Sequence, residues 1–209
     1  MSRGIFKIIM FRLLRTFIFI LLPLFSSGQS AWKLEKNKNG IKVYSSQLPN
    51  SDYKAIRAEC LMAGNYSGLI STITDVPLFT TWIYHAKICS LMVQNSDLDF
   101  IYYSETSLPW PLSDRVAAVH VVINTDSLPK FMTITGSGES WRIPESDEFV
   151  PVTHYSARWN VTMPTANTIF IKYELELNPG GEIPVWIINM FVANGPYETF
   201  SNLAEKLKN

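Results

Sequence analysis

The side chains that most often carry out chemistry are few in this chain, and they are not grouped. The three histidines, His85, His120 and His154, are too far apart for the i, i+4 pairing that places two imidazoles on one helix face. The Asp and Glu residues are scattered, with no pair at a spacing typical of a general acid and base. We therefore predict no catalytic residues, no metal site and no cofactor.

A glycine-rich segment, residues 136–140, comes nearest to a known catalytic or phosphate-binding motif. Its sequence, GSGES, matches neither the GxSxG motif of hydrolases nor a P-loop. We interpret it as a bend or bulge within a strand.

The two cysteines, Cys60 and Cys89, have neither CxxC nor zinc-ligand spacing. In an exported protein they could form a disulfide, which would stabilise the fold by roughly 3 kcal/mol. The alternative is that each is a small hydrophobic residue inside a strand.

The first 28 residues have the pattern of a secretory signal peptide. Arg12 and Arg15 precede an apolar stretch, residues 16–25, which is followed by small residues up to Gly28. The apolar stretch is too short to span a bilayer. We expect cleavage after Gly28, export to the periplasm or the medium, and one domain over residues 29–209.

The composition is that of a globular protein, with 47% hydrophobic and 17% charged residues. The whole chain has a formal net charge of zero, but without residues 1–28 it has 14 basic and 18 acidic residues. A mildly acidic domain without a basic run argues against a nucleic-acid partner and against simple electrostatic adhesion to anionic lipid. We expect a monomer.

Nine strands are predicted from alternating apolar residues between turn signals. The clearest alternation lies in residues 168–178, and Asn39-Gly40 indicates a type I′ hairpin turn between the first two strands. The predicted strands are residues 32–36, 41–47, 53–62, 86–93, 98–106, 115–124, 130–138, 150–161 and 168–178.

Helical spacing occurs after the third strand and again at the end of the chain. Two short helices are predicted at residues 65–74 and 76–82, and a long helix begins near Pro184. Its apolar face is predicted to consist of Trp186, Met190, Ala193, Tyr197, Phe200, Ala204 and Leu207. Pro196 cannot donate to the Val192 carbonyl, so we expect a weak point near Gly195.

These elements predict an α+β fold in which helices lie on one side of an antiparallel sheet. A sheet of nine strands must curl, and a long apolar helix across its mouth then encloses volume. That volume is either filled by side chains or holds a ligand.

A tryptophan between two prolines, in residues 108–115 (LPWPLSDR), lies on a stiff, extended segment. Trp110 is either a plug for a cavity mouth or a loop aromatic packed on the rim of the core. For Arg115, a structural role tying the loop by charge-assisted hydrogen bonds is favoured over ligand contact.

Three blocks resemble the steroidogenic acute regulatory protein-related lipid-transfer (START) family, and the chain is similar to a short, exported bacterial-type member. The blocks are Trp32 with residues 39–44 (NGIKVY), residues 109–115 (PWPLSDR) and residues 173–189 (YELELNPGGEIPVWIIN). The resemblance implies a helix-grip fold, in which a curved nine-stranded sheet holds the C-terminal helix over a hydrophobic tunnel. It also implies that the third and fourth strands lie at opposite ends of the sheet, which favours unpaired cysteines.

The favoured function is non-catalytic binding, with possible transfer, of one lipid or other hydrophobic small molecule in a tunnel gated by the C-terminal helix. Transient membrane contact would accompany transfer. The alternatives are a helix-grip enzyme of cyclase or hydrolase type and a filled fold that serves as an interaction module. The predicted ligand-binding residues are Trp82, Tyr102, Trp110, Arg115, Trp186, Asn189, Met190 and Ala193.

Overall fold

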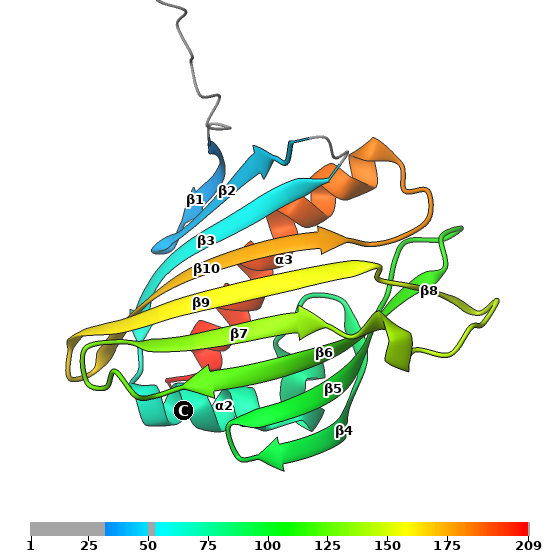
Figure 1. Cartoon of the computed structure of the whole chain (residues 1–209). Helices are drawn as coiled ribbons and strands as arrows, with labels where there is room; N and C mark the ends of the chain where they lie inside the picture. Colours follow the sequence, from blue (N-terminus) through cyan, green and yellow to red (C-terminus); the bar gives the residue numbers. More distant parts are fainter. Residues whose placement is uncertain (1–31, 50–52, 209) are drawn as a thin grey trace, which may run out of the picture. The chain divides into compact units, whose positions relative to one another are not determined.

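A curved sheet surrounds one face of a long helix in the computed structural model, which describes residues 32–49 and 53–208 (Figure 1). The predicted signal peptide lies outside the described residues. Nine strands follow one another across the sheet, and each is antiparallel to its neighbours. In sheet order these are β1 (Lys33–Lys38), β2 (Ile41–Gln47), β3 (Lys54–Ala63), β10 (Thr168–Asn178), β9 (His154–Thr165), β7 (Met132–Gly138), β6 (Asp114–Asn124), β5 (Asp99–Thr106) and β4 (Ala86–Ser96).

The predicted α+β helix-grip fold is confirmed, but the sheet has ten strands rather than nine. The segment predicted as one strand, residues 150–161, is divided. The short strand β8 (Phe149–Pro151) pairs in parallel with β6, and the chain then turns into β9. Pro151 has no N–H with which to continue a ladder, and the next two amides bond to Val116 and Asn178 instead.

The β1–β2 connection confirms the hairpin predicted from Asn39-Gly40. Both residues have positive φ, 52° and 76°, as a type I′ turn requires. The hairpin lies at one edge of the sheet and β4 forms the other edge.

Two short helical segments follow β3, as predicted. Helix α2 (Tyr66–Thr74) begins at Asn65, whose side chain accepts a hydrogen bond from the Gly68 amide at 2.8 Å. The second segment, η1 (Val76–Thr81), is a 3₁₀ helix with Pro77 in its first turn. A further 3₁₀ turn, η2 (Ser140–Arg142), follows β7.

Helix α3 (Val185–Lys206) crosses the concave side of the sheet (Figure 1). It continues through Pro196, as its apolar spacing predicted. Its buried side chains join those of the sheet, α2 and η1 in the main hydrophobic core. Fully buried members from these four elements include Leu69, Val76, Ile171, Phe200 and Leu203.

Cys60 and Cys89 are both free, which confirms the prediction of unpaired cysteines. Cys60 is in β3 and Cys89 is in β4 at the far edge of the sheet. Burial raises the pKa of Cys89 to about 11 and that of Cys60 further. Both thiols are therefore protonated at neutral pH.

Candidate functional site

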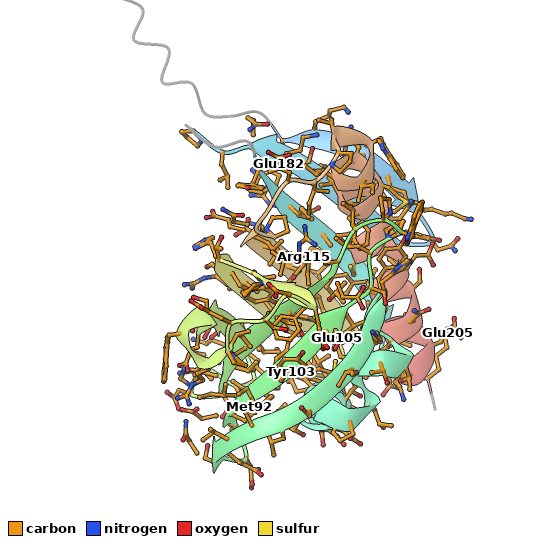
Figure 2. All side chains as sticks on the ribbon, turned by 90° about the vertical axis from the view of Figure 1, so that its right-hand side faces the viewer. Met92, Tyr103, Glu105, Arg115, Glu182 and Glu205 are labelled. Carbon is orange, nitrogen blue, oxygen red and sulfur yellow. The ribbon has the colours of Figure 1, made fainter. Side chains whose placement is uncertain are left out.

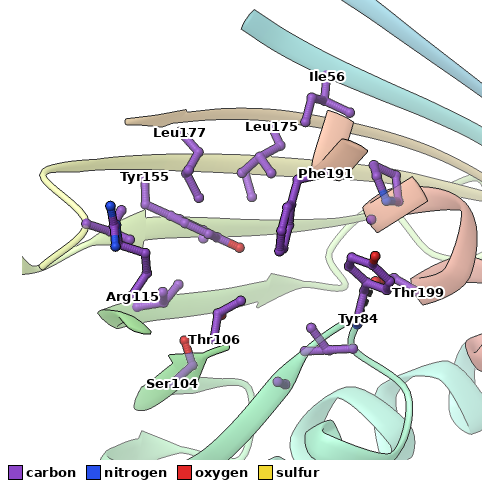
Figure 3. A pocket seen from close by; sticks show the side chains of 18 of the residues that line it. Ile56, Tyr84, Ser104, Thr106, Arg115, Tyr155, Leu175, Leu177, Phe191 and Thr199 are labelled. Carbon is purple, nitrogen blue, oxygen red and sulfur yellow. Dashed lines mark hydrogen bonds between the residues drawn. The ribbon is translucent and has the colours of Figure 1, made fainter. Parts of the chain in front are cut away.

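A cavity of about 320 Å³ lies between the concave face of the sheet, η1 and α3. Most of its wall is aliphatic or aromatic, and Figure 3 shows the side chains of Leu175, Leu177 and Phe191 converging on it. Its volume is at the lower end of the range of about 300–1,000 Å³ typical of ligand sites. The curled sheet and the helix therefore enclose space rather than a completely filled core.

Strand alternation aims side chains from β9 and β10 into the cavity. Tyr155, Ala157 and Trp159 of β9 line it, and so do Tyr173 and Leu175 of β10. Because successive residues of a strand point to opposite faces, these odd-numbered positions share the concave face. Leu175 lies opposite Ala157 in the antiparallel register, which keeps the two rows aligned.

Two aromatic groups close one part of the cavity. On the η1 side, the Phe79 ring lies 5.2 Å from that of Trp82 and 5.1 Å from that of Tyr102, edge to face. On the α3 side, the rings of Trp159, Tyr173 and Phe200 lie within 5.1–5.3 Å of one another. These groups present a rigid apolar surface to any molecule in the cavity.

Three tyrosines place hydroxyl groups within the apolar wall. Burial raises the pKa values of Tyr102, Tyr155 and Tyr173, and hydrogen bonding connects the Tyr155 hydroxyl with the other two. All three are therefore neutral at physiological pH. They can donate hydrogen bonds to a ligand, but they cannot balance a charge.

Glycines in β7 make room for one of these rings. A Cβ atom at Gly136 would lie 3.2 Å from Tyr155 Cε1, and one at Gly138 would lie 3.1 Å from Tyr155 Cβ. Residues 136–138 thus belong to β7, in a register without the predicted bulge, and residues 139 and 140 lie beyond the strand. The lack of side chains at the two glycines allows close approach by β9.

One polar atom on the cavity wall has no partner. Trp82 is 3% exposed, and its Nε1 is the single buried side-chain polar atom without a hydrogen bond among residues 32–49 and 53–208. Buried donors nearly always have an acceptor. An oxygen atom of a bound molecule or an ordered water would satisfy this one.

Arg115, at the start of β6, is the most deeply buried charged residue on the wall, with 5% exposure. Its Nε donates to the Pro179 carbonyl at 2.8 Å, one terminal nitrogen donates to Gly180 O at 3.2 Å, and the other donates to Ser113 O. The guanidinium therefore joins the loop before β6 to the turn before α3. This confirms the structural role predicted for Arg115.

The turn that Arg115 holds requires glycine. Gly180 and Gly181 have φ of 69° and 60°, and a Cβ at Gly180 would lie only 2.5 Å from the Pro151 carbonyl oxygen. The Gly180 amide donates to the side chain of Asn178 at 2.9 Å. The turn therefore fixes where α3 begins relative to β8 and β10.

Of the predicted ligand-binding residues, Trp82, Tyr102 and Arg115 line the cavity. Trp110 does not, because Asp114 accepts a hydrogen bond from the Leu108 amide and closes a loop that leaves Trp110 92% exposed. The prediction that Trp110 plugs the mouth or packs on the core is therefore wrong.

The four predicted residues on α3, Trp186, Asn189, Met190 and Ala193, also lie outside the lining. Trp186 is 63% exposed, and Asn189 accepts a hydrogen bond from Lys54 Nζ at 2.9 Å. The cavity instead meets the adjacent helix face, whose lining residues are Ile187, Ile188, Phe191, Val192, Gly195, Pro196, Thr199 and Phe200. The first half of α3 is apolar on several sides, so spacing alone did not define which side faces inward.

Two groups that could act as an acid or a base in an enzyme, His120 and Glu105, face away from the cavity. His120 Nε2 lies 2.7 Å from Asp99 Oδ1, and Glu105 lies 2.6 Å from Lys87 Nζ, but neither His120 nor Glu105 lines the cavity. Within the described part of the chain, no group of three or more His, Cys, Asp or Glu side chains is placed to hold a metal ion.

Sequence reasoning missed Tyr155, Trp159 and Phe191 as wall residues. The alternation of Tyr155, Ala157 and Trp159 is a signal for the inward face of β9, but it becomes clear only when β9 is separated from β8. Phe191 can be predicted as a wall residue only when the inward face of α3 is known. That face depends on the contacts of α3 with the sheet.

No protein-family model matches the chain. In sequence, it is 28% identical over 172 residues to an uncharacterized protein of Pseudomonas aeruginosa, covering 82% of this chain and 84% of that protein. It is 22% identical over 184 residues to the phosphatidylcholine transfer protein of Mus musculus, covering 85% and 84%.

Solved structures share its fold. A STAR-related lipid transfer protein of Xanthomonas axonopodis aligns with a TM-score of 0.76 and 24% identity, over 85% of this chain and 99% of that chain. Human STARD10 aligns with a TM-score of 0.72 and 13% identity, over 88% and 76%. The predicted resemblance to the START family is thus confirmed in fold.

Proposed function

From this START-like helix-grip fold, we propose that the protein binds one lipid or other hydrophobic small molecule in the cavity and transfers it between membranes. The observation that carries the proposal is the apolar cavity under α3, walled by aliphatic and aromatic side chains. Burial of several hundred Å² of apolar ligand surface supplies on the order of 10 kcal/mol before the costs of association. The similar proteins named for lipid transfer support the same class of function.

Helix α3 acts as the gate of the cavity. Gly195 and Pro196 both line the cavity, and Pro196 interrupts the helical hydrogen-bond ladder at the Val192 carbonyl. The helix can therefore bend at this point with a smaller loss of hydrogen bonds than elsewhere. Opening of the residues before Pro196 would expose the apolar wall.

Exposed aromatic residues near the start of α3 favour transient membrane contact during transfer. Trp110 is 92% exposed and Trp186 is 63% exposed. Arg115 bonds to both Ser113 and Pro179, so it brings together the loop that carries Trp110 and the turn that leads to Trp186. Tryptophan favours the membrane–water interface. Among the helices that the structure describes, none is long and apolar enough to cross a membrane.

The protein acts outside the cytoplasm as a monomer, after removal of the predicted signal peptide. It has no catalytic role and no nucleic-acid partner. The enzyme alternative is disfavoured because no His, Asp or Glu is among the described residues that line the cavity. The filled interaction module is disfavoured by the size of the cavity.

Native mass spectrometry of the purified protein, followed by solvent extraction, tests this function. One co-purifying hydrophobic molecule per chain is expected. An unliganded mass, together with no uptake from a mixed panel of phospholipids, fatty acids and sterols, would overturn the proposal.

A further inference from the structure

Arg115 forms no salt bridge in the described part of the chain. The guanidinium is bonded to three neutral carbonyl groups, and no carboxylate there lies within ion-pair distance of it. Asp114, its neighbour in sequence, bonds to Lys87 Nζ at 2.9 Å and to the Leu108 amide instead. Burial of this cation is unfavourable and lowers the pKa of Arg115, and the negative charge of the neighbouring Asp114 offsets this only in part. An anion from outside the chain would compensate the charge.

No acidic side chain among residues 32–49 and 53–208 lines the cavity, whereas two cationic residues, Arg115 and Lys54, do. Both cations lie at the same end. Arg115 bonds to the turn that follows β10, and Ala55, the residue after Lys54, pairs with Glu176 near the end of β10. In the view of Figure 2, Arg115 lies between the labelled Glu182 and Glu105. Glu182 is exposed and Glu105 is paired with Lys87, and neither lines the cavity.

The first turn of α3 adds to the positive potential at this end. The helix begins after Pro184 with no side-chain cap and no acidic residue in its first turn. The N-terminus of a helix has a partial positive charge of about half an elementary charge. Its Ile187 and Ile188 side chains line the same cavity.

The opposite part of the cavity is uncharged. It contains the two aromatic groups around Phe79 and Phe200, and their polar atoms, which include the hydroxyls of Tyr102 and Tyr173 and the Nε1 of Trp82, are neutral. The cavity is thus polarised, with a cationic end at the start of α3 and an apolar, aromatic end beneath the second half of the helix.

We infer that the ligand is a compact anionic amphiphile, whose carboxylate or phosphate group lies against Arg115 and whose apolar part extends over the aromatic wall. This inference rests on the proposed function and names the ligand class for the same cavity. A volume of about 320 Å³ fits one alkyl chain or a small ring system better than a two-chain phospholipid.

The test compares dodecanoate and dodecyl phosphate with dodecanol and dodecyltrimethylammonium, which have the same chain with a neutral or a cationic end. Binding to the purified wild-type protein is measured by isothermal titration calorimetry below micellar concentrations. The anions are expected to bind about tenfold more tightly than dodecanol or better, because charge-assisted hydrogen bonds replace neutral ones. Dodecyltrimethylammonium is expected to bind most weakly.

Arg115→Met should remove most of the preference for the anions and retain binding of dodecanol. Arg158→Met is the matched control, because Arg158 is exposed and alternates with the cavity-lining residues Ala157 and Trp159 of β9. Arg158→Met should leave the preference unchanged. If Arg115→Met does not fold, the headgroup series on the wild-type protein still decides the question.

Equal affinity of the wild-type protein for dodecanol and dodecanoate would overturn the inference and leave the proposed function intact. Competition by millimolar inorganic phosphate alone would show a site for the free anion and would also overturn it. Failure to bind any of the four chains or phosphatidylcholine would overturn the proposed function itself.

Discussion

The second half of α3, residues 196–206, is packed more deeply than the half that precedes it. Phe200 and Leu203 are at most 1% exposed, and Tyr197 accepts a hydrogen bond from Asn39 beneath Lys36 Nζ. In the first half, Ile187 and Val192 are buried, but Val185 is 70% exposed and Trp186 is 63% exposed.

The two halves are also held by different bonds. Thr199 accepts from the Tyr84 amide at 3.1 Å and Asn202 donates to the Trp82 carbonyl at 3.3 Å, both beside η1. In the first half, Asn189 accepts from the half-buried Lys54 at 2.9 Å, and Asn194 accepts from Lys36 at 3.1 Å. The second half of the helix thus packs in the main hydrophobic core, whereas the first half begins with an exposed turn and covers the cavity, and Pro196 lies at their boundary.

The largest difference is expected when each half is truncated. Phe200→Ala should lower the free energy of unfolding by about 3–5 kcal/mol, because the ring is buried against Trp159 and Tyr173. Val185→Ala should change it by less than about 0.5 kcal/mol. Urea denaturation measures both, and similar losses would show that the halves are equally anchored.

Replacement of both Gly195 and Pro196 by Ala should remove the boundary between the halves. The added Gly195 methyl fits, since a Cβ there would lie 3.6 Å from Tyr84. The restored N–H can complete the ladder to Val192, and we expect ligand exchange to slow several-fold. Stopped-flow release of a fluorescent fatty acid measures the rate, with Gly195→Ala alone as the control. An unchanged rate in the double variant would argue against the gate.

Trp186→Ala with Trp110→Ala should separate membrane contact from stability. Both side chains are largely exposed, so the urea midpoint should hardly move. Association with phosphatidylcholine vesicles in a flotation assay should fall about threefold or more. Leu61→Ala, which truncates a side chain that is 53% exposed on β3, is the control and should have no effect on association.

The smallest effect concerns pH at the loop that leads into β6. The hydrogen bond from Lys87 lowers the pKa of Asp114, so the folded state favours the ionised carboxylate. This contribution, below about 1 kcal/mol, is present at neutral pH and is lost as the pH falls below about 4. Asp114→Asn should therefore be less stable than the wild type at pH 7, and the difference should shrink as the pH falls through the lowered pKa of Asp114. A difference that stays constant as the pH falls would contradict the assignment.

The fold was predictable because its signals are local. Alternation in residues 168–178, the Asn39-Gly40 turn and the two glycines before α3 each define one element, and their order matched that of a known family. The cavity wall was harder to predict. Successive residues of a strand point to opposite faces, and Tyr102 lines the cavity as expected. The orientation of α3, in contrast, depends on its contacts with β1, with β3 and with Trp82 at the end of η1.

A fluorescence titration tests the central claim, that the cavity binds a single hydrophobic molecule. Trp82 and Trp159 line the cavity. A variant with the other four tryptophans, Trp32, Trp110, Trp141 and Trp186, replaced by Phe would report from the wall alone. We predict that a bromine-labelled dodecanoate quenches this fluorescence and that quenching saturates at one ligand per chain. Absent quenching, or quenching that increases without saturation, would contradict a ligand site beneath α3.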